Sequence, residues 1–195
     1  MATLWGIDYG KKRSGNTVIC IKRGTIIKFL KAEKDQDADD FILEAAEGLS
    51  PRRIFIDAPL SLPGAYYNQQ VYDDFFFRRC DQQLGAMSPM FLGGLTARAI
   101  RLKSMLLAMD IELRETYPKA LANHLRLKEC GYRRGKENLE RCSKSIMESS
   151  LLSFDKASVA SWHHFDALLA LVSALRHEQK LSYTFGDPQE GQIYI

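Results

Sequence analysis

The sequence contains no long hydrophobic run. No apolar stretch in its 195 residues approaches the roughly 20 residues that a membrane-spanning helix requires. The first residues also lack the basic-then-apolar pattern of a secretory signal, because Gly6 and Asp8 interrupt the apolar stretch at once. We therefore expect no membrane association and no secretion.

Cysteine is scarce and scattered. There are four cysteines and no C-x-x-C pair, which argues against a disulfide framework and a structural zinc site and favours reduced thiols in the cytoplasm. Internal repeats, linkers and low-complexity segments are also missing. With 46% apolar and 26% charged residues, the composition predicts a single globular domain over residues 1–195.

An excess of charge of one sign is missing as well. The formal net charge is only +3. Short basic clusters recur, and we interpret them as solvated loops and helix faces. They are Lys11-Lys12-Arg13, Lys22-Arg23, Arg52-Arg53, Arg78-Arg79 and Arg133-Arg134. This charge distribution permits a nucleic-acid partner but does not require one.

The N-terminal part of the chain has the pattern of a sheet with one helical crossover. Short β-rich stretches at 3–8, 16–22 and 25–33 predict an antiparallel meander. Residues 37–49 predict a helix with acids in its first turn, and residues 52–60 predict a fourth strand. A strand reached through a helical crossover is usually parallel to its partner, so we expect the fourth strand to run parallel to the first.

A long connection follows the fourth strand. It covers residues 59–110 and contains two helical patterns, at 73–84 and 95–110, before a fifth strand at 111–117. The remaining predicted elements are helices at 119–129, 136–152 and 161–179, and a C-terminal hairpin within 181–195. The whole pattern predicts an α/β fold.

Two of the predicted strands end in an acid in the same register. Asp8 closes "WGID" and Asp57 closes "IFID". If the two strands are parallel neighbours, both carboxylates lie near the carboxyl-terminal edge of the sheet. This is the first group of residues that predicts chemistry.

Asp166 is the only charged residue between Phe165 and Leu175. Small residues occupy the helix face on or near its side, which allows close approach to another element. A buried carboxylate costs several kcal/mol unless it is paired, hydrogen-bonded or bound to a cation. An ion pair or a backbone hydrogen bond would therefore also explain Asp166.

Taken together, these acids favour a metal site. Asp8, Asp57 and Asp166 all lie on or beside apolar elements, and Glu115, at the end of the fifth strand, is a fourth candidate. Neighbouring carboxylates repel one another unless a cation is present, and Mg²⁺ or Mn²⁺ prefers such oxygen ligands. Two such ions about 4 Å apart stabilise phosphoryl displacement.

The order of elements and acids resembles the ribonuclease H-like fold. "GIDYGKKRSG" resembles the opening motif of its Holliday-junction-resolvase-like branch. The blocks "IDAPLSLP", "RRCDQQL", "ETYP" and "HHFDALLALVSAL" resemble a family of uncharacterised domains classed as predicted RNase H-like nucleases. The resemblance implies a mixed five-stranded sheet flanked by helices, with a helical insertion and a C-terminal hairpin. It also implies a metal-dependent phosphodiesterase site at Asp8, Asp57 and Asp166, with Glu115 less certain, that acts on nucleic acid.

Further residues are candidates for supporting roles. His163 lies on the Asp166 side of its helix, where it would orient a metal ligand or carry a proton, or simply begin a helix. Arg78 is expected either to contact a substrate phosphate or to form a surface ion pair with Asp81. Lys11 and Lys12 would meet a phosphate backbone or only occupy a turn. Aromatic residues near Arg78 would stack on bases or pack the insertion onto the sheet.

Two other functions remain open from the sequence. The stretch "GIDYG" also resembles the phosphate-binding hairpin of sugar-kinase and actin-like ATPases, which usually need two such domains. A ribonuclease H-like scaffold that binds nucleic acid or protein without catalysis would keep the same acids. The oligomeric state is not encoded in any pattern that we recognise.

Overall fold

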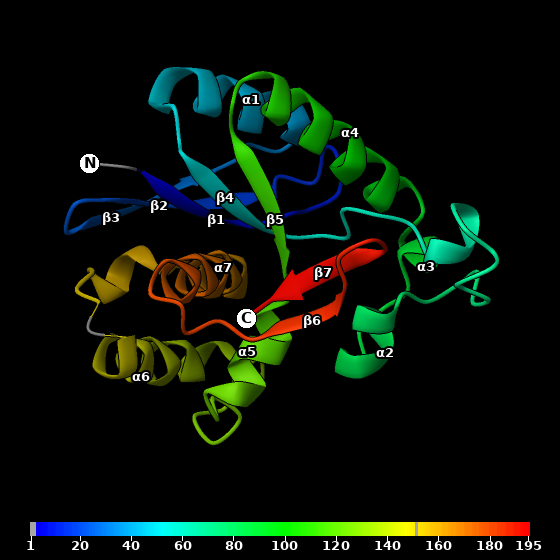
Figure 1. Ribbon diagram of the computed structural model, residues 1–195. Coiled ribbons are helices and arrows are strands. Elements are labelled where there is room, and N and C mark those ends of the chain that lie inside the picture. Colours follow the sequence, from blue (N-terminus) through cyan, green and yellow to red (C-terminus); the bar gives the residue numbers. More distant parts are fainter. Residues whose placement is uncertain (1–2, 151) are drawn as a thin grey trace.

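The computed structural model describes residues 3–150 and 152–195. Within these ranges seven strands form one sheet, in the order β3-β2-β1-β4-β5-β7-β6 (Figure 1). The strands are β1 (Leu4–Asp8), β2 (Val18–Arg23), β3 (Ile26–Lys31), β4 (Arg53–Asp57), β5 (Glu112–Thr116), β6 (Thr184–Asp187) and β7 (Gly191–Tyr194). The first five form the predicted mixed sheet, and the predicted C-terminal hairpin extends it beyond β5.

The central strand is β1. It is antiparallel to β2 and parallel to β4, and Asp8 lies opposite Asp57 in the register. The parallel direction follows from the crossover through α1 (Ala38–Leu49), whose first turn is capped by the Asp37 carboxylate. The predicted pairing of the first and fourth strands is confirmed.

Helices cover both faces of the sheet (Figure 1). One face is covered by α1 and α4 (Gly94–Ala108), and the other by α5 (Pro118–His124), α6 (Leu139–Ser150) and α7 (Trp162–Glu178). Each face has its own apolar core. One core contains Ile7, Ile56 and Leu106, and the other contains Phe165 and Leu168. The sheet therefore separates the protein into two layers of side chains.

The sheet and a helix approach each other closely at Gly6. A Cβ placed on Gly6 would lie 2.0 Å from the Leu171 amide nitrogen and 2.3 Å from the Ala167 carbonyl oxygen. These residues belong to α7, whose small-residue face was predicted to allow close packing. The contact packs the middle of α7 onto the middle of β1.

Gly6→Ala is expected to lower the free energy of unfolding by about 1–3 kcal/mol, because an overpacked core displaces its neighbours. The atoms that it would meet are backbone atoms, which do not change rotamer. Urea denaturation measures the change. Gly48→Ala is the control, since its Cβ meets nothing within 4 Å and alanine is favoured in a helix. Equal midpoints for Gly6→Ala and wild type would contradict the close packing.

The insertion between β4 and β5 differs in part from prediction. The helix expected at 73–84 begins only at α2 (Arg79–Leu84), because the Asp74 carboxylate accepts the backbone N–H groups of Phe76 and Phe77 and holds a turn. A short helix, α3 (Pro89–Leu92), was not predicted. The helix expected at 95–110 is α4.

Two later helices are shorter than predicted. The helix expected at 119–129 ends at His124, and the one expected at 136–152 begins as a 3₁₀ turn at Lys136–Asn138 before α6. Residue 151, within the second prediction, lies outside the described residues. The helix expected at 161–179 is α7, capped by the Ser161 hydroxyl.

In the two described ranges, no helix combines the length and the apolar character needed to cross a membrane. The four cysteines are free thiols. The cytoplasmic location stays a prediction.

Candidate functional site

Three of the predicted acids come together on one face of the sheet. Asp8 and Asp57 end neighbouring parallel strands opposite each other, so their side chains point to the same face, toward α7. Asp166 lies in the second turn of α7 and is fully buried. Three segments far apart in the sequence thus place one carboxylate each at the same sheet edge.

Asp57 carries the least compensated charge of the three. Burial raises its pKa well above the usual range, and the negative charges of Asp8 and Asp166 raise it further. Arg133 acts in the opposite direction without reversing the shift. The Asp57 side chain lines a cavity of about 420 Å³. Its carboxylate is therefore available to a cation.

Asp8 is oriented by a histidine. The Nδ1 atom of His163, at the start of α7, lies 2.7 Å from Oδ2 of Asp8. This hydrogen bond raises the pKa of His163, against the opposing effect of burial. His163 thus occupies the supporting position that its place on the helix suggested.

Asp166 is held by Tyr132 and Arg133, neither of which any local pattern connects with it. The Tyr132 hydroxyl donates to Oδ1 of Asp166 at 2.6 Å, and the Arg133 guanidinium pairs with Oδ2. Burial still raises the pKa of Asp166 to about 6, although Arg133 lowers it. Asp166 thus has the ion pair that was the alternative explanation for it, and it also lies beside the other two acids.

The arginine comes from a loop with a distinctive sequence. Gly131 and Gly135 flank Tyr132 and Arg133, and both glycines and Arg133 have positive φ angles. Such angles favour glycine and mark a tightly turned backbone. "CGYRRG" was interpreted as a solvated basic pair, and only the tertiary fold places its first arginine on Asp166.

Glu115 lines the same cavity as Asp57 and Asp166, and its negative charge adds to the raised pKa of Asp57, but its own oxygens have other partners. It pairs with Ile56, one residue before Asp57, so strand alternation directs it toward the face covered by α1 and α4. Its two oxygens accept hydrogen bonds at 2.7 Å from Nη1 and Nη2 of Arg78, and one also accepts the Leu60 amide. Glu115 is therefore bound to the insertion rather than directed at Asp57.

The expected surface ion pair between Arg78 and Asp81 is buried instead. Arg78 is 0% exposed, and it donates to Asp81, Glu115 and the Ser61 hydroxyl. Burial lowers the pKa of Arg78, but Glu115 and Asp81 outweigh this effect and raise the pKa above its usual value. The spacing of three residues identified the pair. It contained no information on β5, whose Glu115 also binds Arg78 in the interior. Arg78 borders the cavity with its guanidinium already engaged.

The two lysines after β1 lie in an exposed turn. Lys12 pairs with Asp37, the residue that caps α1, at 2.9 Å, and neither Lys11 nor Lys12 lines the cavity. The cations that line the cavity with Asp57 are instead Arg78, Lys119 and Arg133, and the guanidinium of Arg78 is already engaged. The structure does not bring Lys11 and Lys12 together with the acids.

The side chains do not form a complete metal-binding group. Within residues 3–150 and 152–195, no three His, Cys, Asp or Glu side chains are arranged so that they could hold a metal ion. The hydrogen bonds explain this arrangement, because Asp8 faces His163 and Asp166 faces Tyr132 and Arg133. The donor chemistry still suits a hard cation, since Asp57 is left desolvated beside two like charges.

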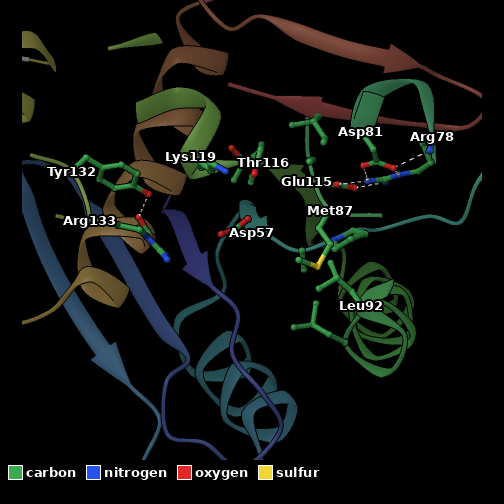
Figure 2. A pocket seen from close by; sticks show the side chains of 17 residues that line it. Asp57, Arg78, Asp81, Met87, Leu92, Glu115, Thr116, Lys119, Tyr132 and Arg133 are labelled. Atoms are coloured by element: carbon green, nitrogen blue, oxygen red, sulfur yellow. Dashed lines mark hydrogen bonds and ion pairs between the residues drawn. The ribbon is translucent and has the colours of Figure 1, made fainter. Parts of the chain in front are cut away.

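The cavity beside Asp57 has walls of different chemistry. Figure 2 shows Asp57 between the Tyr132–Arg133 side and the side that carries Met87 and Leu92. Thr116 comes from the end of β5, and Lys119 comes from the start of α5. The site thus combines acids, cations and an apolar wall from the insertion.

Comparisons with known proteins find matches among solved structures. No protein-family model matches the sequence, and no curated protein matches it. Among solved structures, RuvC of T. thermophilus in complex with Holliday junction substrate matches with a TM-score of 0.49 and 13% identity, over 93% of this chain and 98% of that chain. A Thermus thermophilus RuvC structure matches with a TM-score of 0.43 and 11% identity, over 91% and 96%. At such identities the similarities do not identify catalytic residues. Membership in the uncharacterised nuclease family stays a prediction.

Proposed function

We propose that this chain is a divalent-metal-dependent phosphodiesterase of the nuclease class. One observation carries the proposal: β1, β4 and α7 each place a carboxylate at the same sheet edge, and the least compensated of them lines an open cavity. A purely structural set of acids would be expected to have one cationic partner for each. Asp57 instead keeps a raised pKa beside Asp8 and Asp166.

Asp8, Asp57 and Asp166 would hold Mg²⁺ or Mn²⁺. When bound, the metal supplies an activated water and stabilises the charge that develops on a phosphate. His163 keeps the Asp8 carboxylate in one orientation, as supporting partners of metal ligands commonly do. Glu115 acts at a distance in this proposal, by holding Arg78 and with it the wall of the cavity.

Nucleic acid is the proposed substrate. Lys119 and Arg133 line the same cavity as Asp57, where a phosphate that approached the acids would meet positive charge. Lys11 and Lys12 are exposed beyond the end of β1 and would contact a longer backbone. Together these cations reduce the repulsion between the carboxylates and an anionic ligand.

The proposal is tested by metal binding and cleavage with the wild-type protein. Calorimetry with Mn²⁺ measures binding, and labelled single-stranded DNA, duplex DNA, RNA and a branched junction are incubated with Mn²⁺, Mg²⁺ or EDTA. We expect millimolar or tighter Mn²⁺ binding and cleavage that EDTA abolishes. The proposal would be overturned if the protein bound no Mn²⁺ at millimolar concentration and cleaved none of these substrates.

Arg133→Gln is expected to raise the affinity for Mn²⁺ by about tenfold, since neutralising one charge at a few ångströms is commonly equivalent to about 1.4 kcal/mol or more. The substitution frees Asp166 from a competing cation. The matched control is Arg134→Gln, because Arg134 is exposed in the same loop. Weaker Mn²⁺ binding in Arg133→Gln than in Arg134→Gln would show that Arg133 supports the metal site.

A second candidate function is a nucleic-acid-binding module without catalysis. The observation that favours it is the pairing of Arg133 with Asp166, which neutralises part of the acidic set without a metal. Binding of nucleic acid that is insensitive to EDTA, with no cleavage by wild type or Arg133→Gln, would select this function over the nuclease.

A further inference from the structure

The cavity beside Asp57 has two walls that suit the two halves of a nucleotide. Met87, Leu92 and Leu95 from the insertion form an apolar wall, while Lys119 and Arg133 stand on another side. Asp57 lies between the two sets (Figure 2). A ligand that fills this space is apolar at one end and anionic at the other.

Two of the three side chains of the apolar wall are left uncovered by the cores, whereas Leu95 packs against one of them. Met87 is 59% exposed, in the connection between α2 and α3, and Leu92 is only half-buried. Neither belongs to the two apolar cores. Large apolar side chains left uncovered beside charged groups are typical of ligand sites.

The size of the cavity limits the ligand. A volume of about 420 Å³ lies in the lower part of the range for small-molecule sites, which is roughly 300–1,000 Å³. It accommodates one nucleotide. A duplex, whose bases are stacked inside, cannot place a base against Met87 unless that base leaves the stack.

We infer that this cavity binds one unpaired nucleotide, with its base against the wall formed by Met87, Leu92 and Leu95 and its phosphate toward Lys119 and Arg133. The inference rests on the proposed function, because it places that phosphate beside Asp57. It names the substrate class: a strand with an unpaired position at the site of cleavage, or a free nucleotide. Both sources present the same chemistry.

The test separates recognition of the base from attraction to the phosphate. Fluorescence anisotropy with Ca²⁺ in place of Mg²⁺ compares a labelled dT12 strand with an abasic 12-mer of equal charge and with a 12-base-pair blunt duplex. We expect dT12 to bind about tenfold more tightly than the abasic strand and the duplex, since this factor corresponds to about 1.4 kcal/mol, which is within the usual contribution of contacts to one base. Competition with dTMP distinguishes the sources. If dTMP displaces dT12, the ligand is a free nucleotide, and if dTMP does not displace it, the ligand is a strand.

Substitutions of Met87 locate the base. Met87→Glu should remove the preference for dT12 over the abasic strand, and Met87→Leu should keep it. Leu181→Glu is the control, because Leu181 is 58% exposed and lies outside the cavity lining. Equal binding of dT12 and the abasic strand by wild type, or an unchanged preference in Met87→Glu, would overturn the inference.

The same samples are assayed for Mn²⁺-dependent cleavage. Cleavage without base preference would overturn this inference and leave the nuclease proposal intact. Base preference without metal binding or cleavage would overturn the nuclease proposal and leave the nucleotide site.

Discussion

Asp57→Asn is expected to reduce metal-dependent cleavage by about 100-fold or more, because even residues that only support metal ligands contribute 10–100-fold. The same substitution is expected to stabilise the fold by about 1 kcal/mol, as commonly occurs when a destabilising group at a functional site is removed. Burial and the charges of Asp8 and Asp166 destabilise the Asp57 carboxylate, and asparagine carries no charge. Loss of activity together with a gain of stability distinguishes a functional acid from a structural one.

The stability gain should depend on pH. The folded protein holds the Asp57 proton more tightly than the unfolded chain, because the pKa of Asp57 lies above its ordinary value of 3.8. The unfolded chain therefore binds fewer protons, and the wild-type contribution to stability falls as pH rises from about 4 through the raised pKa. Above that pKa the difference between Asp57→Asn and wild type is complete.

Thermal unfolding at several pH values measures this difference. A gain of about 1 kcal/mol corresponds to roughly 2–4 °C for a chain of this size. Asp40→Asn is the control, since Asp40 is exposed on α1, and it should change neither cleavage nor the pH dependence. A lower melting temperature for Asp57→Asn would show that the carboxylate stabilises the fold.

Arg78→Ala is expected to lower the free energy of unfolding by about 3–5 kcal/mol, because removal of one partner from a buried ion pair leaves uncompensated charge. Arg78 is 0% exposed, and its loss would leave Asp81 and Glu115 buried without their shared cation. The cost should be concentrated where the insertion meets β5, since Glu115 belongs to β5 and Asp81 to α2.

Urea denaturation of Arg78→Ala is compared with that of Arg79→Ala. Arg79 is the neighbouring residue, but its ion pair with Asp187 is half exposed, and its loss should cost about 1 kcal/mol or less. The adjacent control holds the helix position and the type of substitution nearly constant. Equal losses of unfolding free energy in the two variants would contradict a stabilising role for the buried ion pairs of Arg78 with Asp81 and Glu115.

Much of the fold was determined by local patterns. Short β-rich stretches and one helical crossover are sufficient to predict that Asp8 and Asp57 lie opposite each other, because a crossover makes the strands parallel and both acids close them in the same register. The small residues around the lone acid likewise predicted that α7 packs closely on another element, which the structure shows to be β1. These relations depend on periodicity and chain direction, which the sequence contains.

The supporting contacts depended on the tertiary structure. No local pattern indicates that Arg133 reaches Asp166, because 33 residues separate them and the loop between two glycines is directed by its packing. Glu115 shows the same limit: its position at the end of a strand suggested an acid near Asp57, and it lines the same cavity, but no local pattern indicates that its oxygens bind Arg78.

The sequence by itself determined the sheet, the closing acids of β1 and β4, and the helix that carries Asp166, because hydrophobic periodicity and turn residues act over a few positions. Only the tertiary structure decided which charges are paired and which are left open to a ligand. Pairing depends on distances between side chains from segments far apart in the chain, so the uncompensated position of Asp57 is a property of the folded protein.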